Sequence, residues 1–497
     1  MAPDSVKRKS TEGDGDDTVD SKRHAGESQP IAEESNDIEM GEFEGLPEDM
    51  SSDDEEDVIE AGDDMDDDEE NEEQTARKSR KQVFRPDIMN LGPDEELVPD
   101  SSVYKMLHRV NAQWPALSFD IIPDSLGDER RSYPATAYFV AGSQAAKSKE
   151  NELTVIKLSN LCKTQEGDSD SEEESDDDMD SDPILESKSL PMVGGTNRVR
   201  VNRRACESGE YMCASTNETG DVYIWDITQH VKSFDTPGIA TKGKVNKPAY
   251  TVTAHGRVEG FALDWNRHVP EGCLITGDIS GRIFISNRSS SGNWTTDKRA
   301  YIGHDEGHSI EELLWSPTEK TVFSSAGSDG FIRIWDTRMD GRVPALSLKA
   351  STSDVNVMTW SDRLSYLLAS GHDDGSWGVW DLRSLNPSTV STASPVASFT
   401  FHKSPITSIE FNPEDESVVA VASEDNTVTL WDLAVEADDE EIQQQKETET
   451  DLKDVPAQLL FIHWQKHVKE VHWHRQMPGT LLSTGADGFA IWKTISV

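Results

Sequence analysis

The sequence is poor in cysteine and contains no long apolar run. Its 497 residues include four cysteines at irregular spacings and no CxxC pair, so we expect neither a disulfide framework nor a zinc site, and a reducing compartment fits best. No apolar stretch approaches the roughly 18 residues of a membrane span, and the charged N-terminus lacks the apolar core of a secretory signal. Only 34% of the residues are hydrophobic, which is low for a chain of this size that folds throughout. We therefore expect no membrane association, and disorder in part of the chain.

The motifs of enzymatic and cofactor sites are also missing. The sequence has no P-loop, no GxSxG and no HExxH, the motifs by which phosphate-binding, acyl-transfer and metalloprotease sites are recognised. A fold alone does not exclude activity, so this expectation depends on the missing site. We expect a binding protein that is not an enzyme, with no catalytic residue, no cofactor and no metal.

The net charge of −48 is concentrated in four acidic tracts. The tracts 1–47, 48–73, 166–182 and 436–451 hold 49 of the 95 acidic residues and 6 of the 47 basic ones, so the remainder is nearly neutral. Tracts of this kind repel themselves and stay extended. Their negative field attracts basic ligands over a long range, and salt weakens the attraction. The pattern favours a basic protein as partner over a role as simple solubility tails.

Direct binding of nucleic acid is not expected. A phosphate backbone needs neutralising cations, and no basic stripe interleaved with aromatic residues occurs. Short basic clusters at 7–9, 21–23 and 77–81 indicate nuclear-import signals instead. Serines followed by acidic residues, the pattern that acidophilic kinases favour, are expected phosphorylation sites. They are Ser51, Ser52, Ser169, Ser171 and Ser175.

The dipeptide Trp-Asp recurs at the ends of short strands with alternating apolar residues. Four copies end the segments DVYIWD, FIRIWD, SWGVWD and TVTLWD, and two degenerate copies end at Asn287 and Lys493. Spacings of 45 to 61 residues scatter around the ~40–45-residue period of a four-stranded propeller blade, lengthened by insertions. With one more blade built from earlier strands, the sequence predicts an all-β, seven-bladed WD40 propeller with a short N-terminal helix and a disordered acidic tail and loops.

A second landmark keeps the same register. An Asp in a tight turn lies six residues before the Trp of three blades, and a His begins most units. This periodic set resembles the His–Asp–Ser/Thr–Trp network of WD-repeat proteins, which ties the strands of a blade together, so we expect structural rather than catalytic residues. The connection DEGHS leaves open whether His304 or His308 is the structural histidine. The expected network comprises His304, Asp329, Trp335, Asp374, Trp380, His402, Asp425 and Trp431, together with His255, either His463 or His467, and Asp487.

The pattern divides the chain into three parts. We expect a disordered acidic tail with basic clusters at 1–82, an N-terminal segment at 83–116, and the propeller at 117–497, with acidic insertions at 164–182 and 436–456. The insertions interrupt the first and sixth blades after their third strands. Because equivalent loops of a propeller lie on the same side, both insertions should project from one rim.

Within the N-terminal segment, LVPDSSVYKMLHRV predicts a short helix. Asp100 or Ser101 would cap it, and Val103, Leu107 and Val110 fall on one helical face. We expect this face to pack against the outside of a neighbouring blade.

The ring needs an outer strand from the start of the chain, because the last repeat ends with only three strands of its own. We expect Leu117 to Ile122 to supply it, since closure leaves no long exposed sheet edge. The first blade would then use strands at 133–141, 153–159 and 184–192.

Longer motifs point to a family. The segment NAQWPALSFDI, at 111–121, resembles histone-binding WD-repeat proteins. Together with DEELVPDSSVYKMLH, the acidic loop of the first blade, SIEELLWSPTEKTVFSSAGSDGFIRIWDTR, SDVNVMTWS and GFAIWKTISV, it resembles the glutamate-rich WD-repeat proteins, the ribosome-assembly branch of that group, from about residue 80 onward.

The resemblance implies a client and a location. It implies a dedicated chaperone of large-subunit ribosomal protein three (uL-three) in large-subunit biogenesis, found in the nucleus and nucleolus with some in the cytoplasm. Family members have also been linked to histones. Either client is basic and must be shielded from nucleic acid before assembly, which the acidic tracts suit. Without its client the chain is expected to be a monomer.

We expect the disc to grip the client while acidic residues neutralise its basic extensions. In each blade, the residue at the start of the innermost strand often faces one surface of the disc. Candidate client-binding residues are Asn197, Glu259, Glu311, Asn356, Thr407 and Lys469 on the disc, and Glu172, Glu173, Glu174, Asp176, Asp177 and Asp178 in the first insertion.

Two alternative functions stay open. A histone chaperone or chromatin adaptor would use the N-terminal helix and the adjoining acidic loop as a groove for a basic helix. A substrate receptor of a cullin-type ubiquitin ligase is indicated by WDTR at Trp335–Arg338 and WDLR at Trp380–Arg383, which resemble the WDxR box of such receptors, although so short a motif arises easily in propellers.

Overall fold

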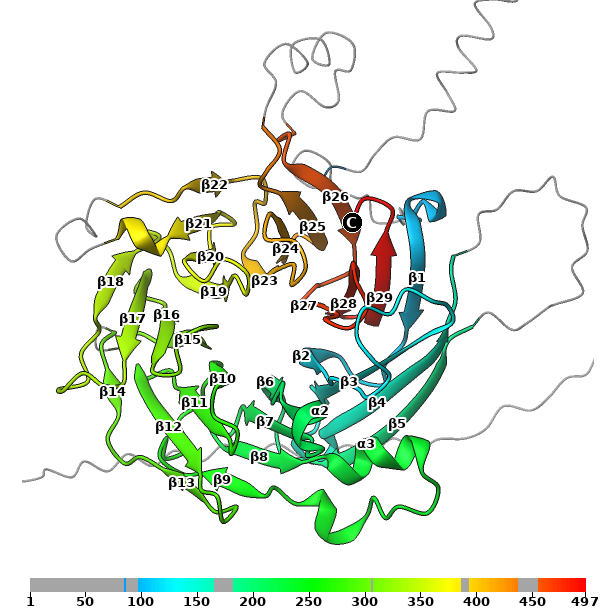
Figure 1. Ribbon diagram of the computed structural model, residues 1–497, viewed down its shortest axis with the longest axis horizontal. Helices are drawn as coiled ribbons and strands as arrows, with labels where there is room; N and C mark the ends of the chain where they lie inside the picture. The colour runs from blue at the N-terminus through cyan, green and yellow to red at the C-terminus, as the bar shows by residue number, and fades with distance from the viewer. Residues whose placement is uncertain (1–84, 86–96, 165–181, 305–306, 386–392, 437–454) are drawn as a thin grey trace, which may run out of the picture. The chain divides into compact units, whose positions relative to one another are not determined.

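The computed structural model describes residues 85, 97–164, 182–304, 307–385, 393–436 and 455–497. Seven antiparallel sheets of these residues close into a ring (Figure 1), which confirms the seven-bladed WD40 propeller. None of the helices in these ranges has the length and apolar character of a membrane span.

The first four blades each run from an inner to an outer strand in chain order. Blade 1 contains β2 (Ala116–Ile121), β3 (Ala135–Ser143), β4 (Glu152–Leu161) and β5 (Ile184–Pro191). Blade 2 contains β6 (Thr196–Val201), β7 (Met212–Asn217), β8 (Val222–Asp226) and β9 (Tyr250–Val252). Blade 3 contains β10 (Leu263–Trp265), β11 (Cys273–Gly277), β12 (Arg282–Arg288) and β13 (Trp294–Thr296), with β14 (Tyr301–Ile302) also paired to β12. Blade 4 contains β15 (Ile310–Trp315), β16 (Val322–Gly327), β17 (Phe331–Asp336) and β18 (Leu346–Lys349).

The last three blades complete the ring. Blade 5 contains β19 (Val355–Trp360), β20 (Leu367–His372), β21 (Trp377–Asp381) and β22 (Ala397–Phe399). Blade 6 contains β23 (Ile406–Phe411), β24 (Val418–Ser423), β25 (Thr427–Asp432) and β26 (Leu459–Trp464). Blade 7 contains β27 (Glu470–Trp473), β28 (Thr480–Gly485), β29 (Gly488–Thr494) and, as its outer strand, β1 (Tyr104–Val110). Short helices α2 (Ala205–Ser208) and α3 (Thr228–Asp235) belong to connections of blade 2.

The N-terminal helix expected at 97–110 is wrong beyond its first turn. A three-residue 3-10 helix, η1 (Ser101–Val103), is capped by Asp100, whose carboxylate accepts the Ser102 N–H at 3.1 Å. From Tyr104 the chain is the strand β1, paired with β29. An irregularity in the register between Tyr104 and Met106 interrupts the strand alternation, so the apolar residues mimic helical spacing. Pairing along the otherwise open edge of β29 outweighs that local preference.

The strand expected to close the ring, Leu117 to Ile122, is also wrongly placed. β1 closes the ring, and β2 is the innermost strand of blade 1. Phe119 of β2 is fully buried and packs edge-on against Phe139 and Phe489, which an outer strand could not achieve. The ring therefore begins at Tyr104, inside the segment 83–116.

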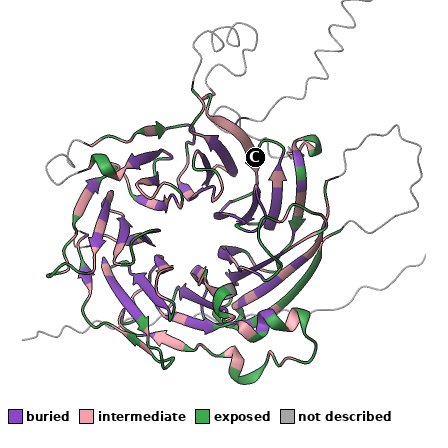
Figure 2. Cartoon of the chain, in the orientation of Figure 1, coloured by how far each residue is buried: buried purple, intermediate pink, exposed green. Residues whose placement is uncertain are grey.

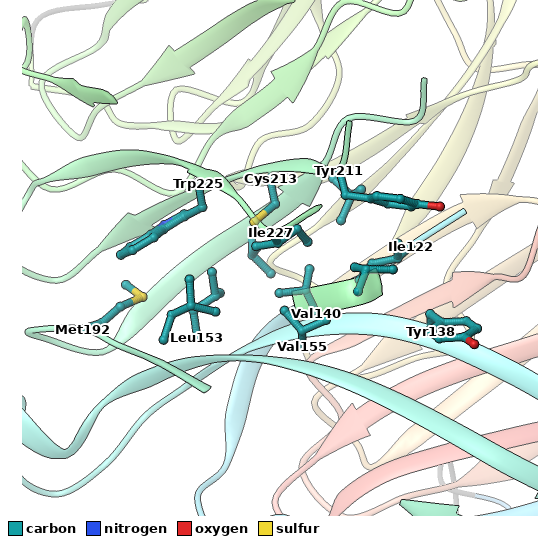
Figure 3. Packing of buried hydrophobic residues seen from close by; sticks show 14 residues of the cluster. Ile122, Tyr138, Val140, Leu153, Val155, Met192, Tyr211, Cys213, Trp225 and Ile227 are labelled. Carbon is teal, nitrogen blue, oxygen red and sulfur yellow. The ribbon is translucent and has the colours of Figure 1, made fainter. Parts of the chain in front are cut away.

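Successive blades pack face to face, and burial falls from the inner strands to the rim (Figure 2). In the seam between blades 1 and 2, Val140 and Val155 lie against Cys213 and Trp225 (Figure 3), and all four side chains are at most 2% exposed. Burying such side chains contributes about 1.5–3 kcal/mol each relative to leaving them in water. Seven seams of this kind explain why so thin a ring is stable.

The expected His–Asp–Ser/Thr–Trp network is confirmed in blades 4 and 6. In blade 4, the Nδ1 atom of His304 lies 3.0 Å from Asp329, its Nε2 atom 2.8 Å from Ser325 Oγ, and Trp335 Nε1 donates to the same hydroxyl at 2.9 Å. His304 is thus the structural histidine, while His308 contacts Ser328. In blade 6 the matching residues are His402, Asp425, Thr429 and Trp431. In blade 3 they are His255, Thr276 and Asp278, the last of which the sequence reading missed.

Blades 5 and 7 use substitutes. In blade 5, His372 from the second strand lies 3.0 Å from Ser370 Oγ, to which Trp380 Nε1 donates, and Asp374 accepts from Ser376, which also contacts His372. In blade 7, neither His463 nor His467 holds the expected position. The side chain of Gln465 accepts from Ser483 Oγ at 2.6 Å, and Trp492 Nε1 donates to that hydroxyl. An amide oxygen here provides the acceptor that histidine supplies elsewhere.

Candidate protein-binding surface

The two faces of the ring carry different connections. Face A contains the starts of the innermost strands and the turns between second and third strands, such as 328–330. Face B contains the connections between first and second strands and between third and fourth strands, including 162–183 and 433–458. Because the strands of each blade alternate in direction, every loop of one kind opens on the same face.

The six disc candidates lie at equivalent places on face A. Register irregularities in four innermost strands place Asn197, Glu311, Asn356 and Thr407 at β-bulges. Such bulges bend a strand and re-aim one side chain. All six candidates are half-buried: Asn197, Glu259, Glu311, Asn356, Thr407 and Lys469.

These side chains also hold the ring together. Asn197 Nδ2 donates to Glu259 Oε1 at 2.8 Å, which joins blades 2 and 3. The Asn356 amide donates to the Ile406 carbonyl at 3.3 Å, and the Thr407 hydroxyl to the Val468 carbonyl at 3.4 Å. Other candidates are held as well: Lys469 pairs with Glu424 at 2.9 Å, and Glu311 accepts from Ser309, while burial raises its pKa. Face A is thus a polar ring of inter-blade bridges.

The acidic insertion candidates cannot be placed in the same way. Glu172, Glu173, Glu174, Asp176, Asp177 and Asp178 lie outside the described residues. The flanking strands fix where the insertion joins the ring, because β4 ends and β5 begins on face B.

Three consecutive blades have unusually long outer strands, and each of these strands follows an acidic tract. β5, β26 and β1 contain 8, 6 and 7 residues, whereas β9, β13, β18 and β22 contain three or four. β5 follows the tract 166–182, β26 follows 436–451, and the chain before β1 carries 48–73. We call the outer strands β26, β1 and β5 the rim sector (Figure 1).

The rim sector joins its acidic tracts to one face. β1 pairs antiparallel with β29, with Tyr104 opposite Thr494 and Val110 opposite Phe489, so β1 starts at face B. β5 and β26 also start there, because each follows a connection between third and fourth strands. The sequence indicated one rim for the two insertions but missed the N-terminal tract, since it misassigned 104–110.

The centre of the ring holds a buried ion network. Glu470 of β27 accepts the Phe119 N–H at 2.8 Å and pairs with Arg198 at 3.1 Å and Arg200 at 2.8 Å. Arg198 also reaches Glu312 of blade 4 at 3.3 Å. Burial opposes ionisation of Glu470, but Arg200, His472 and Arg198 together hold its pKa well below the usual range. The network joins four blades across the ring, so its role is structural.

A second set of ion pairs lies nearer face B. Asp362 of blade 5 pairs with Arg267 of blade 3 at 2.5 Å and with Arg475 of blade 7. Burial would raise the pKa of Asp362, but the arginines Arg475, Arg203 and Arg267 lower it strongly. Because these residues bridge blades that are not neighbours, they fix the diameter of the ring.

The two WDxR segments are held by local pairs. Arg338 pairs with Asp336 at 2.6 Å, and Arg383 with Asp381 at 2.7 Å. Both arginine side chains are more than 60% exposed. They lie at the ends of third strands in adjacent blades 4 and 5, outside the rim sector.

We predict that stability is greatest near neutral pH and falls on both sides. Burial lowers the pKa of His372 to about 4, and of His463 and His474 to about 3. Below their unfolded pKa of about 6.5, the unfolded chain gains protons first, so stability falls with pH. The pKa of His472 is raised to about 9: burial opposes its charge, but Glu410 and Glu470 favour it more strongly. The stability that it adds is complete below pH ~6.5 and is lost as pH rises through 9.

Thermal melting midpoints between pH 4.5 and 9.5 would check this prediction. The His472→Gln variant should flatten the alkaline limb and leave the slope between pH 6.5 and 5 unchanged. A wild-type midpoint that stays constant from pH 7 to 9.5 would contradict the assignment of His472.

Known proteins resemble the chain over nearly its whole length. The family described as histone-binding protein RBBP4, or as a component of the CAF1 complex, matches residues 94–162, and the WD domain, G-beta repeat, family matches 296–336, 342–381 and 393–432. Ribosome assembly protein rrb1 of Schizosaccharomyces pombe is 46% identical over 463 residues, which are 93% of this chain and 94% of that protein. Glutamate-rich WD repeat-containing protein 1 of Dictyostelium discoideum is 40% identical (84% and 86%), and protein HEAT STRESS TOLERANT DWD 1 of Arabidopsis thaliana is 38% identical (82% and 90%).

Proposed function

The chain belongs to the family of glutamate-rich WD-repeat proteins that includes ribosome assembly protein rrb1, and from this we propose that it is a ribosome assembly chaperone that holds a basic ribosomal protein without catalysing a reaction. The observation that carries the proposal is the rim sector, where three acidic tracts join one face of an almost neutral ring. A ribosomal protein binds RNA through cationic surfaces, and these surfaces need a counter-charge before assembly.

We propose uL-three of the large subunit as the client, bound in the nucleus and nucleolus with some complex in the cytoplasm. The rim sector would bind its basic extensions, and the bulge residues of face A offer a second surface on the opposite side. Without its client the chain is proposed to be a monomer, since its acidic tracts repel a second copy.

We predict that full-length protein purified from its native source at about 0.1 M salt carries uL-three in near-equal amount. Mass spectrometry of the purified complex checks the prediction. Raising salt to about 1 M, where the Debye length falls to 3 Å, should release most of the client. A complex without any large-subunit ribosomal protein would overturn the proposed function.

A histone is the second candidate client, favoured by the family match over 94–162. This match spans β1 to β4, so deleting 97–110 would remove the strand that closes the ring and could not separate two clients. A direct comparison of affinities for purified uL-three and for histones H3–H4 decides between them. Tighter binding of histones at every salt concentration would make this candidate the better one.

A further inference from the structure

β5 presents the longest outer strand edge of the ring. Of its eight residues only Leu190 is buried, whereas Ile184 and Leu185 are 56% and 43% exposed. Outer strands of other blades shorten this hazard to three or four residues. A long exposed edge with unpaired backbone groups is a template for another strand.

The backbone of β5 alternates between its neighbour β4 and solvent. Glu152 N donates to Ser143 Oγ on the β3 side, so the N–H groups of Leu153, Val155 and Lys157 point towards β5. Their partners are Leu190, Lys188 and Glu186. The intervening residues therefore turn their N–H and C=O groups outward, and within the described residues none of these N–H groups has a partner. They are Leu185, Ser187 and Ser189.

A cavity lies beside this edge. It has a volume of about 170 Å³ and lies between blade 1 and the connection that follows β1. Its lining includes Trp114, Ile156, Leu185, Ser187 and Phe489. Because side chains of a strand alternate between faces, every second residue of a strand added to β5 would project over this cavity, which suits an apolar side chain.

Charge selects the occupant. The 17 residues 166–182, which lead directly into β5, contain 11 acids and no lysine or arginine. Asp182 and Glu186 at the start of the strand are exposed. A second copy of this chain would bring a second acidic tract to the same place, so self-pairing is disfavoured. A cationic segment gains attraction there as well as main-chain hydrogen bonds.

We propose that β5 binds an extended, basic segment of the client by strand addition, with an apolar side chain of that segment in the cavity beside Trp114. This inference rests on the proposed function and specifies how part of the client is held. Main-chain bonds to Leu185, Ser187 and Ser189 supply affinity, and the cavity supplies register.

The test uses full-length protein and purified uL-three. In Ser187→Pro the outward N–H is lost and the proline ring blocks an added strand, while bonds to β4 stay intact because edge strands tolerate proline on the solvent side. We expect the Kd at 0.15 M salt to rise about 10- to 100-fold in Ser187→Pro. The matched control Ser187→Ala keeps the N–H and should bind like wild type.

Hydrogen exchange gives an independent reading that does not depend on the variant folding well. Amides of peptide 184–191 in wild-type protein should become protected when uL-three is added. Unchanged exchange in this peptide, or equal affinity of Ser187→Pro and wild type, would overturn the inference while leaving uL-three binding intact. Protection that depends on the concentration of the chain alone would show self-pairing and would also overturn it. Failure of wild type to bind uL-three would instead refute the proposed function.

Discussion

Replacing Glu470 by alanine is expected to destabilise the ring by about 3–5 kcal/mol, because removal of one partner leaves buried cations without compensation. The Glu470 side chain is 2% exposed and pairs with Arg198 and Arg200, and His472 lies 3.6 Å away. Its carboxylate also accepts the Phe119 N–H, a buried donor that would lose its partner. Urea unfolding followed by tryptophan fluorescence measures the change.

Two variants calibrate this expectation. Glu470→Gln keeps an acceptor for the Phe119 N–H but removes the charge, so its loss of stability should lie between wild type and Glu470→Ala. Glu271→Ala removes an exposed carboxylate and should change stability by no more than about 0.5 kcal/mol. A loss below about 1 kcal/mol in Glu470→Ala would show that the central network contributes little, against the usual cost of breaking a buried pair.

Neutralising the acidic tracts of the rim sector is expected to have the largest effect on client binding. Replacing the acids of 48–73, 166–182 and 436–451 by Asn and Gln removes 36 negative charges. Association with uL-three at low salt should slow about 10- to 1000-fold, the range that electrostatic steering supplies. Stopped-flow measurements at several salt concentrations check this, and the difference from wild type should shrink as salt rises.

The matched control keeps the charge and changes the order. A variant with the same three tracts in permuted sequence should associate at the wild-type rate, since steering depends on charge and not on sequence. Loss of binding in the permuted variant would show that specific side chains in the tracts are recognised. Equal rates for the neutralised variant and wild type at low salt would remove the electrostatic part of the account.

Local sequence was sufficient for the repeat because its signals lie within one blade. Trp335, Asp329 and His304 recur at fixed spacings, so their network could be predicted before any contact was known. In blade 7 the same position holds Gln465, which a search for histidine misses although its amide accepts the same bond. The strand β1 was misassigned because an irregularity at Tyr104 and Met106 disturbs its alternation.

Features that depend on ring closure could not be predicted in this way. Arg198 and Glu470 are 272 residues apart in sequence, and nothing near either residue indicates the other. The acidic tracts were found from composition alone, but their gathering in one sector follows only from the pairing of β1 with β29. The bulge residues of face A were located by register, whereas their bridging contacts between blades required the packed ring.

Crosslinking mass spectrometry on the native complex tests the central claim most directly. With an amine-reactive reagent, client lysines should link to Lys105, Lys163 and Lys188, which lie in or beside the rim sector. Links confined to lysines of blades 2 to 4, such as Lys247, Lys320 and Lys349, would place the client elsewhere and contradict the account.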